Sequence, residues 1–115
     1  MILALVDDLM FSSKIKTTAA QLGVRVVFAR SKDAALDEMR KLPPALVILD
    51  LNSTRTDPLG TVAAMKREPL LASVPTLGFV SHVRTDIIDA ARQGGVAEVM
   101  ARSAFSERLA EILTR

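Results

Sequence analysis

The stretch ALVILDLN, residues 45–52, decides the fold. Its first five residues form an uninterrupted apolar run, which is typical of a strand that is buried on both faces. A carboxylate follows at once at Asp50, and Asn52 lies two residues further on. Because a strand buried on both faces needs helices above and below it, the stretch predicts the central strand of a parallel sheet with Asp50 at its carboxyl end.

Four other short apolar runs accompany this stretch, and each is too short for a helix. We therefore expect five strands, at residues 2–6, 24–28, 45–51, 75–80 and 97–100. The segments between and after them have the spacing of amphipathic helices, and strict alternation of strand and helix implies parallel strands with right-handed crossovers. The predicted fold class is α/β: a doubly wound five-stranded parallel sheet of order 2-1-3-4-5 with helices on both faces, in one domain over residues 1–115.

Start and stop signals delimit five predicted helices. The apolar stripe of the first helix ends at Gly23, a residue type that often closes a helix in the left-handed conformation. Ser31 and Thr85 are expected to cap the second and fourth helices, and Asp57 with Pro58 is expected to begin the third. The other signals are the stops at Pro43-Pro44, Glu68-Pro69 and Gly94-Gly95, and the apolar stripe Phe105, Leu109, Ile112 and Leu113 of the last helix.

Composition narrows the function classes. The chain of 115 residues is half hydrophobic, and all four of its aromatic residues are Phe. It has no Cys, which excludes disulfides, thiolate metal sites and a Cys nucleophile. Its net charge is +2 without an evident basic face, so nucleic acid is not an expected partner. No apolar run approaches the ~20 residues of a membrane span, and we expect a soluble, cytoplasmic protein without a membrane partner.

Acidic and hydroxyl side chains follow three of the predicted strands. Strand one ends in Asp7-Asp8, strand three in Asp50, and strand four in Ser81. Because open α/β sheets bind ligands beyond the carboxyl ends of their strands, these groups are predicted to share one rim. Crowded carboxylates repel one another unless a cation lies among them, and Mg²⁺ suits such oxygen ligands, with a backbone carbonyl near Asn52 as a further one. The same ion would assist phosphoryl transfer to a carboxylate, and Asp50 is the expected nucleophile.

Each of these residues also has a purely structural interpretation. Asp7 and Asp8 would cap the first helix, and Asp50 would be a turn residue. Ser81 would cap the helix that follows it. His82, the single His, is interpreted as a loop residue, because no second His exists to complete a metal pair.

The order of these features resembles the CheY-like receiver domains of two-component response regulators, along the whole chain. The resemblance implies that Asp7 and Asp8 hold Mg²⁺, with Asp8 the more direct ligand. It implies that Asp50 accepts a phosphoryl group, that the carbonyl of Asn52 ligates the metal, and that Ser81 supplies the hydroxyl at the end of strand four. It further implies a histidine kinase or other signalling protein as partner, a monomer or weak homodimer, and a partner face at Arg92, Glu98, Arg108 and Glu111.

Several positions depart from the family pattern. The Lys that usually ends strand five falls on Ala101, which cannot contact phosphoryl oxygens. Arg102 follows it as a candidate phosphoryl contact, although strand alternation would point this residue to the opposite face unless the strand end bulges. Glu98 stands where the family has a switch aromatic, and His82 where it has a small residue. Metal binding is therefore better preserved than the phosphorylation switch. We expect a receiver-like module of a phosphorelay that acts mainly through protein contacts, either with a working switch or as a degenerate member.

Two other functions share parts of this pattern. Residues 50–54 read DLNST, close to the D-x-D-x-T motif of haloacid-dehalogenase-like phosphatases with Asp50 as nucleophile, but that motif normally follows the first strand and has an Asp where Asn52 stands. A nucleotide- or flavin-binding domain would share the fold class. Its first turn, however, would be residues 7–10, which contain no Gly and two charges that repel phosphate. The receiver-like hypothesis is preferred, with no enzyme activity beyond self-phosphorylation and dephosphorylation at Asp50.

Overall fold

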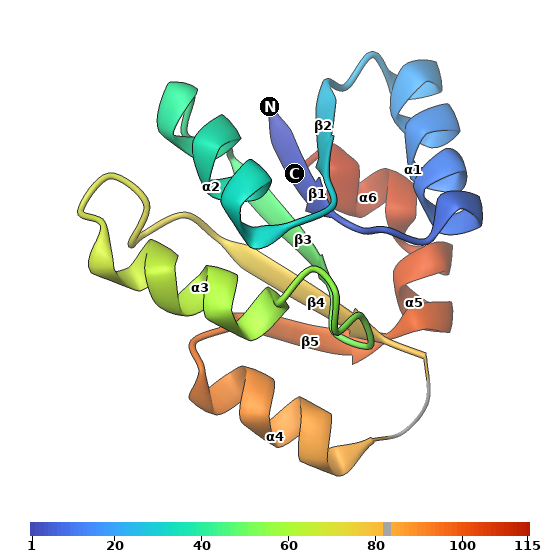
Figure 1. Cartoon of the computed structure of the whole chain (residues 1–115). Coiled ribbons are helices and arrows are strands. Elements are labelled where there is room, and N and C mark those ends of the chain that lie inside the picture. Colours follow the sequence, from blue (N-terminus) through green and yellow to red (C-terminus); the bar gives the residue numbers. More distant parts are fainter. Residues whose placement is uncertain (82–83) are drawn as a thin grey trace.

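A five-stranded sheet forms the centre of the molecule (Figure 1). The computed structural model describes residues 1–81 and 84–115. The strands are β1 Ile2–Leu5, β2 Val26–Ala29, β3 Leu46–Asp50, β4 Thr76–Val80 and β5 Glu98–Ala101. All neighbouring pairs are parallel, and the order β2-β1-β3-β4-β5 confirms the predicted doubly wound sheet. The chain reverses its direction of winding between β1 and β3, so the crevice beyond these two strands is where such sheets bind ligands.

Helices cover both faces of the sheet (Figure 1). They are α1 Leu9–Leu22, α2 Lys32–Lys41, α3 Pro58–Arg67, α4 Thr85–Gln93, α5 Arg102–Glu107 and α6 Leu109–Leu113. One apolar core forms where α1, α5 and α6 pack on the sheet, and a second forms under α2, α3 and α4. Every residue of β1, β3 and β4 is buried, as the uninterrupted apolar run predicted. No helix within residues 1–81 and 84–115 is both long and apolar enough to cross a bilayer.

Local signals in the sequence determine most helix ends. Gly23 closes α1 in the left-handed conformation, with φ of 68°. At the start of α2, the Ser31 hydroxyl accepts the backbone N–H of Ala34 at 3.1 Å. Asp57 begins α3 from a φ of 48°, and its carboxylate accepts the N–H of Gly60 at 3.1 Å. These three predicted boundaries are confirmed.

Three other predicted boundaries are wrong. Thr85 is the first residue of α4, and Arg84 holds the cap position without a side-chain hydrogen bond. β2 begins two residues later than expected, because the N–H of Val24 bonds to the carbonyl of Ala19 at 2.9 Å and completes the end of α1. The last helix is divided at Arg108 into α5 and α6, although its apolar stripe continues across the break. The buried residues of that stripe are Phe105, Leu109, Ile112 and Leu113.

Three of the four Phe residues form one cluster between α1, β4 and α5. The ring centroids of Phe11 and Phe79 are 4.7 Å apart, those of Phe79 and Phe105 4.8 Å, and those of Phe11 and Phe105 5.7 Å. These spacings lie in the favourable range for aromatic pairs. Phe79 is also the register partner of Asp50. The aromatic cluster therefore lies directly beside the carboxyl end of the central strand.

Candidate functional site

Polar residues from four connections meet at the carboxyl ends of the strands. The register aligns these ends, because Leu5 pairs with Leu49 and Asp50 with Phe79. A depression of about 350 Å³ lies there, which we call the acidic hollow. It is lined by Asp7, Asp8, Asp50, Asn52, Ser53, Thr54, Arg55, Ser81 and Arg102. The structure thus brings together every residue proposed from the sequence as a metal ligand, nucleophile or phosphoryl contact.

Asp50 is the buried carboxylate of the acidic hollow. It is the last residue of β3 and only 6% exposed. One oxygen, Oδ1, accepts the backbone N–H of Asn52 at 3.0 Å, so Asp50 also shapes the turn after the strand. Burial raises the pKa of the Asp50 carboxyl, while the N–H of Asn52 and the charge of Arg102 oppose the rise and the charges of Asp7 and Asp8 add to it. The surroundings of Asp50 therefore disfavour its ionised form relative to a carboxyl group in water.

Asp8 is both a helix cap and part of the acidic hollow. Its Oδ1 accepts the backbone N–H of Phe11 at 3.0 Å at the start of α1, so the structural interpretation of this residue holds. Its Oδ2 accepts a hydrogen bond from the Arg102 guanidinium at 2.9 Å. The Phe11 N–H and then Arg102 lower the pKa of the Asp8 carboxyl below its ordinary value. Since this carboxylate already occupies the amino end of α1, the position where a nucleotide phosphate would bind is taken.

Arg102 reaches the acidic hollow although strand alternation predicted the opposite face. That expectation is wrong because β5 ends at Ala101 and α5 begins at Arg102, so the alternation stops before this residue. The guanidinium carbon lies 4.1 Å from the ring centroid of Phe11 and 5.8 Å from that of Phe79. Ala101 is exposed at the strand end and carries no polar group. A cation therefore enters the hollow from the first residue of the helix instead of the last residue of the strand.

The side chain of Asn52 holds Ser81. Its Oδ1 atom accepts hydrogen bonds from the backbone N–H of Ser81 at 2.6 Å and from the Ser81 hydroxyl at 2.9 Å. Ser81 is not the cap of α4, because Arg84 holds that position. His82, which the sequence analysis interpreted as a loop residue, lies outside the described residues. The loop after β3 is thus linked to the end of β4 through one amide side chain.

Sequence reasoning missed four features of this site. The role of the Asn52 side chain was not foreseen, because only its backbone carbonyl was considered. Ser53, Thr54 and Arg55 also line the hollow. The available signal was the length and polarity of the loop after Asp50, which is the longest polar connection in the sequence. Arg55 brings a second cation to the rim of an otherwise acidic site.

The donor atoms suit Mg²⁺ in type but not all are free. Carboxylate oxygens of Asp7 and Asp50 and the carbonyl of Asn52 are hard oxygen ligands of the kind that Mg²⁺ prefers. Both oxygens of Asp8 already accept hydrogen bonds, one from Arg102. Within the described part of the chain, no three Asp, Glu or His side chains are grouped as a ready metal site. A metal ion bound to Asp8 Oδ2 would therefore lie beside the guanidinium of Arg102.

The four residues of the predicted partner face are all exposed. Arg108 pairs with Glu111 at 3.3 Å, and Glu111 also pairs with Arg115 at 3.3 Å. Glu98 forms an ion pair with the same Arg115. Three members of the face therefore belong to one charge network, with Glu98 on β5, Arg108 at the break before α6 and Glu111 on α6, while Arg92 lies in the last turn of α4.

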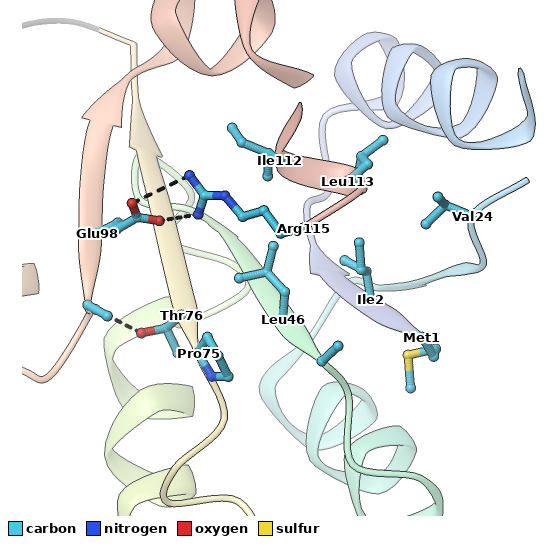
Figure 2. Close-up of a pocket in the computed structure, with 12 residues that line it drawn as sticks. Met1, Ile2, Val24, Leu46, Pro75, Thr76, Glu98, Ile112, Leu113 and Arg115 are labelled. Carbon is cyan, nitrogen blue, oxygen red and sulfur yellow. Dashed lines mark hydrogen bonds and ion pairs between the residues drawn. The ribbon is translucent and has the colours of Figure 1, made fainter. Parts of the chain in front are cut away.

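A second depression lies at the opposite ends of the strands (Figure 2). We call it the amino-end groove; its volume is about 440 Å³. Its lining is mostly apolar and includes Ile2, Leu46, Ile112 and Leu113. Figure 2 shows the Arg115 side chain reaching across the groove to Glu98. It is larger than the acidic hollow but contains no cluster of groups suited to catalysis, so we assign the chemistry to the hollow.

Solved structures that are similar to this chain include response-regulator proteins. The chemotaxis protein CheY4 of Vibrio cholerae is 19% identical with a TM-score of 0.85, and the match covers 99% of this chain and 95% of that one. The receiver domain of NtrX from Brucella abortus is 20% identical with a TM-score of 0.82, over 100% and 96% of the two chains. The Mn²⁺-bound form of response regulator Rcp1 is 18% identical with a TM-score of 0.79, over 96% and 89%. No family model matches the chain, and no curated protein matches it.

These likenesses establish that the chain has the fold of CheY-like receiver domains, as predicted. The identities are low, so the fold is what they share with this chain. They lend no support to the phosphatase alternative, whose motif lies here after the third strand of the sheet. Function must be argued from the acidic hollow.

Proposed function

We propose that this domain is a receiver-like signalling module of a phosphorelay, in which Asp50 accepts a phosphoryl group. One observation carries the proposal: a buried carboxylate at the end of the central strand opens into a hollow that also holds Asp7, Asp8, Ser81 and Arg102. The likeness to receiver domains agrees with it. The proposed chemistry is limited to self-phosphorylation and dephosphorylation at Asp50.

The proposed reaction forms an acyl phosphate. Because Oδ1 of Asp50 accepts the N–H of Asn52, the other oxygen, Oδ2, is the one that bonds to phosphorus. The bond between phosphorus and the donor atom breaks, and its electron pair leaves with the donor, the imidazole of a histidine kinase or the acetate of acetyl phosphate. A bound Mg²⁺, held by Asp7, Asp8, Asp50 and the Asn52 carbonyl, would neutralise charge on the phosphoryl oxygens.

Two side chains of the hollow are suited to hold the product. Arg102 supplies the cation that Ala101 cannot, and its charge opposes the rise in the pKa of Asp50. The Ser81 hydroxyl would leave Asn52 to donate to a phosphoryl oxygen. Such a change would move Ser81 at the end of β4, on the chain side that leads to α4 and to the exposed charges of the partner face.

The proposed output is a protein contact. The face formed by Arg92, Glu98, Arg108 and Glu111 is charged and exposed, and it has no switch aromatic beside it. We propose a histidine kinase or another signalling protein as partner, a cytoplasmic location, and a monomer or weak homodimer. If Asp50 is not phosphorylated, the same face would act as a constitutive binding surface.

The test is phosphate-affinity electrophoresis after incubation with acetyl phosphate and Mg²⁺. We expect a shifted band for the native chain and none for Asp50→Asn. Asp37→Asn is the matched control, because Asp37 is an exposed carboxylate on α2 whose ion pair with Arg40 is long, at 3.5 Å. A folded native chain that shows no shift would exclude phosphorylation by acetyl phosphate and favour the constitutive surface. A shift retained in Asp50→Asn would place the phosphoacceptor elsewhere.

A further inference from the structure

Arg102 is held in the acidic hollow by contacts on two sides. Its guanidinium donates to Asp8 Oδ2 at 2.9 Å, and its central carbon lies 4.1 Å from the ring centroid of Phe11. The side chain is only 29% exposed. A planar guanidinium can stack on a ring while it pairs with a carboxylate, which a Lys ammonium does less well. Arg102 is therefore docked in a defined position.

The ring under Arg102 is itself fixed. Phe11 is buried, and it packs against Phe79 and Phe105 with centroids 4.7 and 5.7 Å away. The same residue donates its backbone N–H to Asp8 Oδ1. One residue of α1 thus positions both members of the ion pair. This arrangement gives the hollow a positive charge of its own.

The docked guanidinium and a divalent cation compete for the same carboxylate. Oδ1 of Asp8 caps α1 and Oδ2 accepts from Arg102, so a metal ion that ligates Asp8 through Oδ2 would lie directly beside the guanidinium. Two cations within a few ångströms of one another also repel. We propose that Arg102 is a built-in counter-cation of the acidic hollow, which a divalent cation must displace from Asp8. This inference rests on the proposed function, since it concerns the metal that would assist phosphorylation of Asp50.

Displacement has a second consequence within the same site. Once Arg102 leaves Asp8, its guanidinium is free to turn toward Asp50, whose charge it already affects. Metal entry and delivery of Arg102 to the phosphoryl group would then be one coupled event. A single Arg would thereby lower the affinity for metal in the resting state and bind the product in the phosphorylated state.

The size of the effect follows from the contacts. A partly exposed ion pair and a cation–π contact are each weak, and both are lost on displacement. Together we expect them to reduce metal affinity about tenfold, which corresponds to about 1.4 kcal/mol. Arg102→Gln should bind Mn²⁺ about tenfold more tightly than the native chain. Arg67→Gln should bind it as the native chain does, because it removes the same charge from an exposed position in the last turn of α3.

The experiment is calorimetric titration of Mn²⁺ into the three folded, unphosphorylated proteins, with folding checked by circular dichroism. Equal or weaker binding by Arg102→Gln, or no binding by either it or the native chain, would overturn the proposal. A second measurement separates displacement from a simple charge effect: the Nε–H resonance of Arg102, assigned by its loss in Arg102→Gln, should shift as Mg²⁺ saturates the site. A resonance that stays fixed during Mg²⁺ binding would also overturn it. Because neither measurement involves phosphoryl transfer, failure here is distinct from failure of Asp50 to be phosphorylated.

Discussion

Strand β3 begins in the amino-end groove (Figure 2) and ends in the acidic hollow, so one buried strand joins two different environments. Leu46 at one end and Asp50 at the other are each 6% exposed. Leu46 packs into the apolar core with helices α1, α5 and α6, whereas Asp50 faces carboxylates, an amide and a guanidinium. Equal burial therefore has opposite consequences for the two residues, because burial stabilises an apolar side chain and penalises a charge.

This contrast separates stability from function along a single strand. The amino-end groove is formed by core residues that continue to its surface, so its lining contributes to folding. The acidic hollow is formed by residues that follow the strand ends, and their charges oppose one another. Substitutions at the two ends of β3 should therefore change the free energy of unfolding in opposite directions.

The largest expected change in the free energy of unfolding is at the amino end of β3. Leu46→Ala removes buried methyl groups and leaves a partly filled space, which should lower the free energy of unfolding by about 2–3 kcal/mol. Urea denaturation followed by circular dichroism measures this change. Leu70→Ala is the matched control, since Leu70 is 78% exposed and should change stability by less than about 0.5 kcal/mol. Similar losses for both variants would mean that the groove lining is not part of the core.

A smaller change, which increases stability, is expected on substitution at the carboxyl end of β3. Asp50→Asn keeps the shape of the side chain and removes a buried charge, so it should raise Tm by a few degrees at pH 7 in metal-free buffer. Differential scanning fluorimetry in the presence of a chelator measures it. A clear fall in Tm would show that the ionised form of Asp50 is stabilised in the hollow, contrary to the direction of its pKa.

The pH dependence of this gain follows from that pKa. Because the pKa of Asp50 is raised in the folded state, the folded protein favours the protonated carboxyl. The loss of folding stability caused by the ionised carboxylate is complete above the folded pKa. It disappears below the pKa of the unfolded state, about 3.9. The advantage of Asp50→Asn should therefore shrink as the pH is lowered from 7 toward 4. An advantage that is constant over this range would assign the gain to something other than titration of Asp50.

Asp8 provides a second comparison with Asp50, because both carboxylates line the acidic hollow but only Asp8 is expected to stabilise the fold. Asp8→Ala removes the cap of α1 and the partner of Arg102, and should lower the free energy of unfolding by about 1 kcal/mol. Asp8→Asn keeps a capping oxygen and should lose less. Since the pKa of Asp8 is lowered in the folded state, its contribution is present above its unfolded value and is lost as the pH falls through the folded one, below about pH 4.

The two carboxylates should thus respond to acid in separate ranges. On acidification from pH 7, the difference between the native chain and Asp50→Asn should fade first, and the difference from Asp8→Ala should persist to lower pH. Thermal melts of the three proteins at steps between pH 7 and pH 3.5 test this order. If both differences faded over the same range, the opposite environments inferred for Asp8 and Asp50 would be wrong.

Local sequence signals are sufficient to predict most of the secondary structure. Short apolar runs form the strands, and Gly23, Ser31 and Asp57 end or begin helices through hydrogen bonds that involve only neighbouring residues. Such local signals predict the order of elements, and the order then predicts which strand ends share an edge. The placement of Asp7, Asp8, Asp50 and Ser81 around one hollow follows from that topology. It required no knowledge of side-chain contacts.

The remaining features depend on contacts that no local signal encodes. Arg102 reaches the hollow because β5 ends at Ala101 and α5 begins at Arg102, so strand alternation does not set the direction of this side chain. Its docking on Phe11 joins residues far apart in the chain, as does the bond between Asn52 and Ser81. The break at Arg108 likewise divides a continuous apolar stripe. Sequence patterns identify which side chains share a site, whereas packing decides which of them pair.

The smallest expected change in the free energy of unfolding is at Glu98 and Arg115, which line the amino-end groove. Glu98→Gln removes the ion pair with Arg115, whose two side chains are 46% and 32% exposed. Exposed pairs of this kind contribute little because water and salt screen them, so the free energy of unfolding should fall by less than about 0.5 kcal/mol. The loss should vanish in 1 M NaCl, where the screening length is about 3 Å. Paired urea denaturation of the native chain and Glu98→Gln at low and high salt measures both effects. A loss above about 1 kcal/mol that persists at high salt would mean that Glu98 and Arg115 close the groove as part of the core, and the two ends of β3 would then differ less than their lining residues indicate.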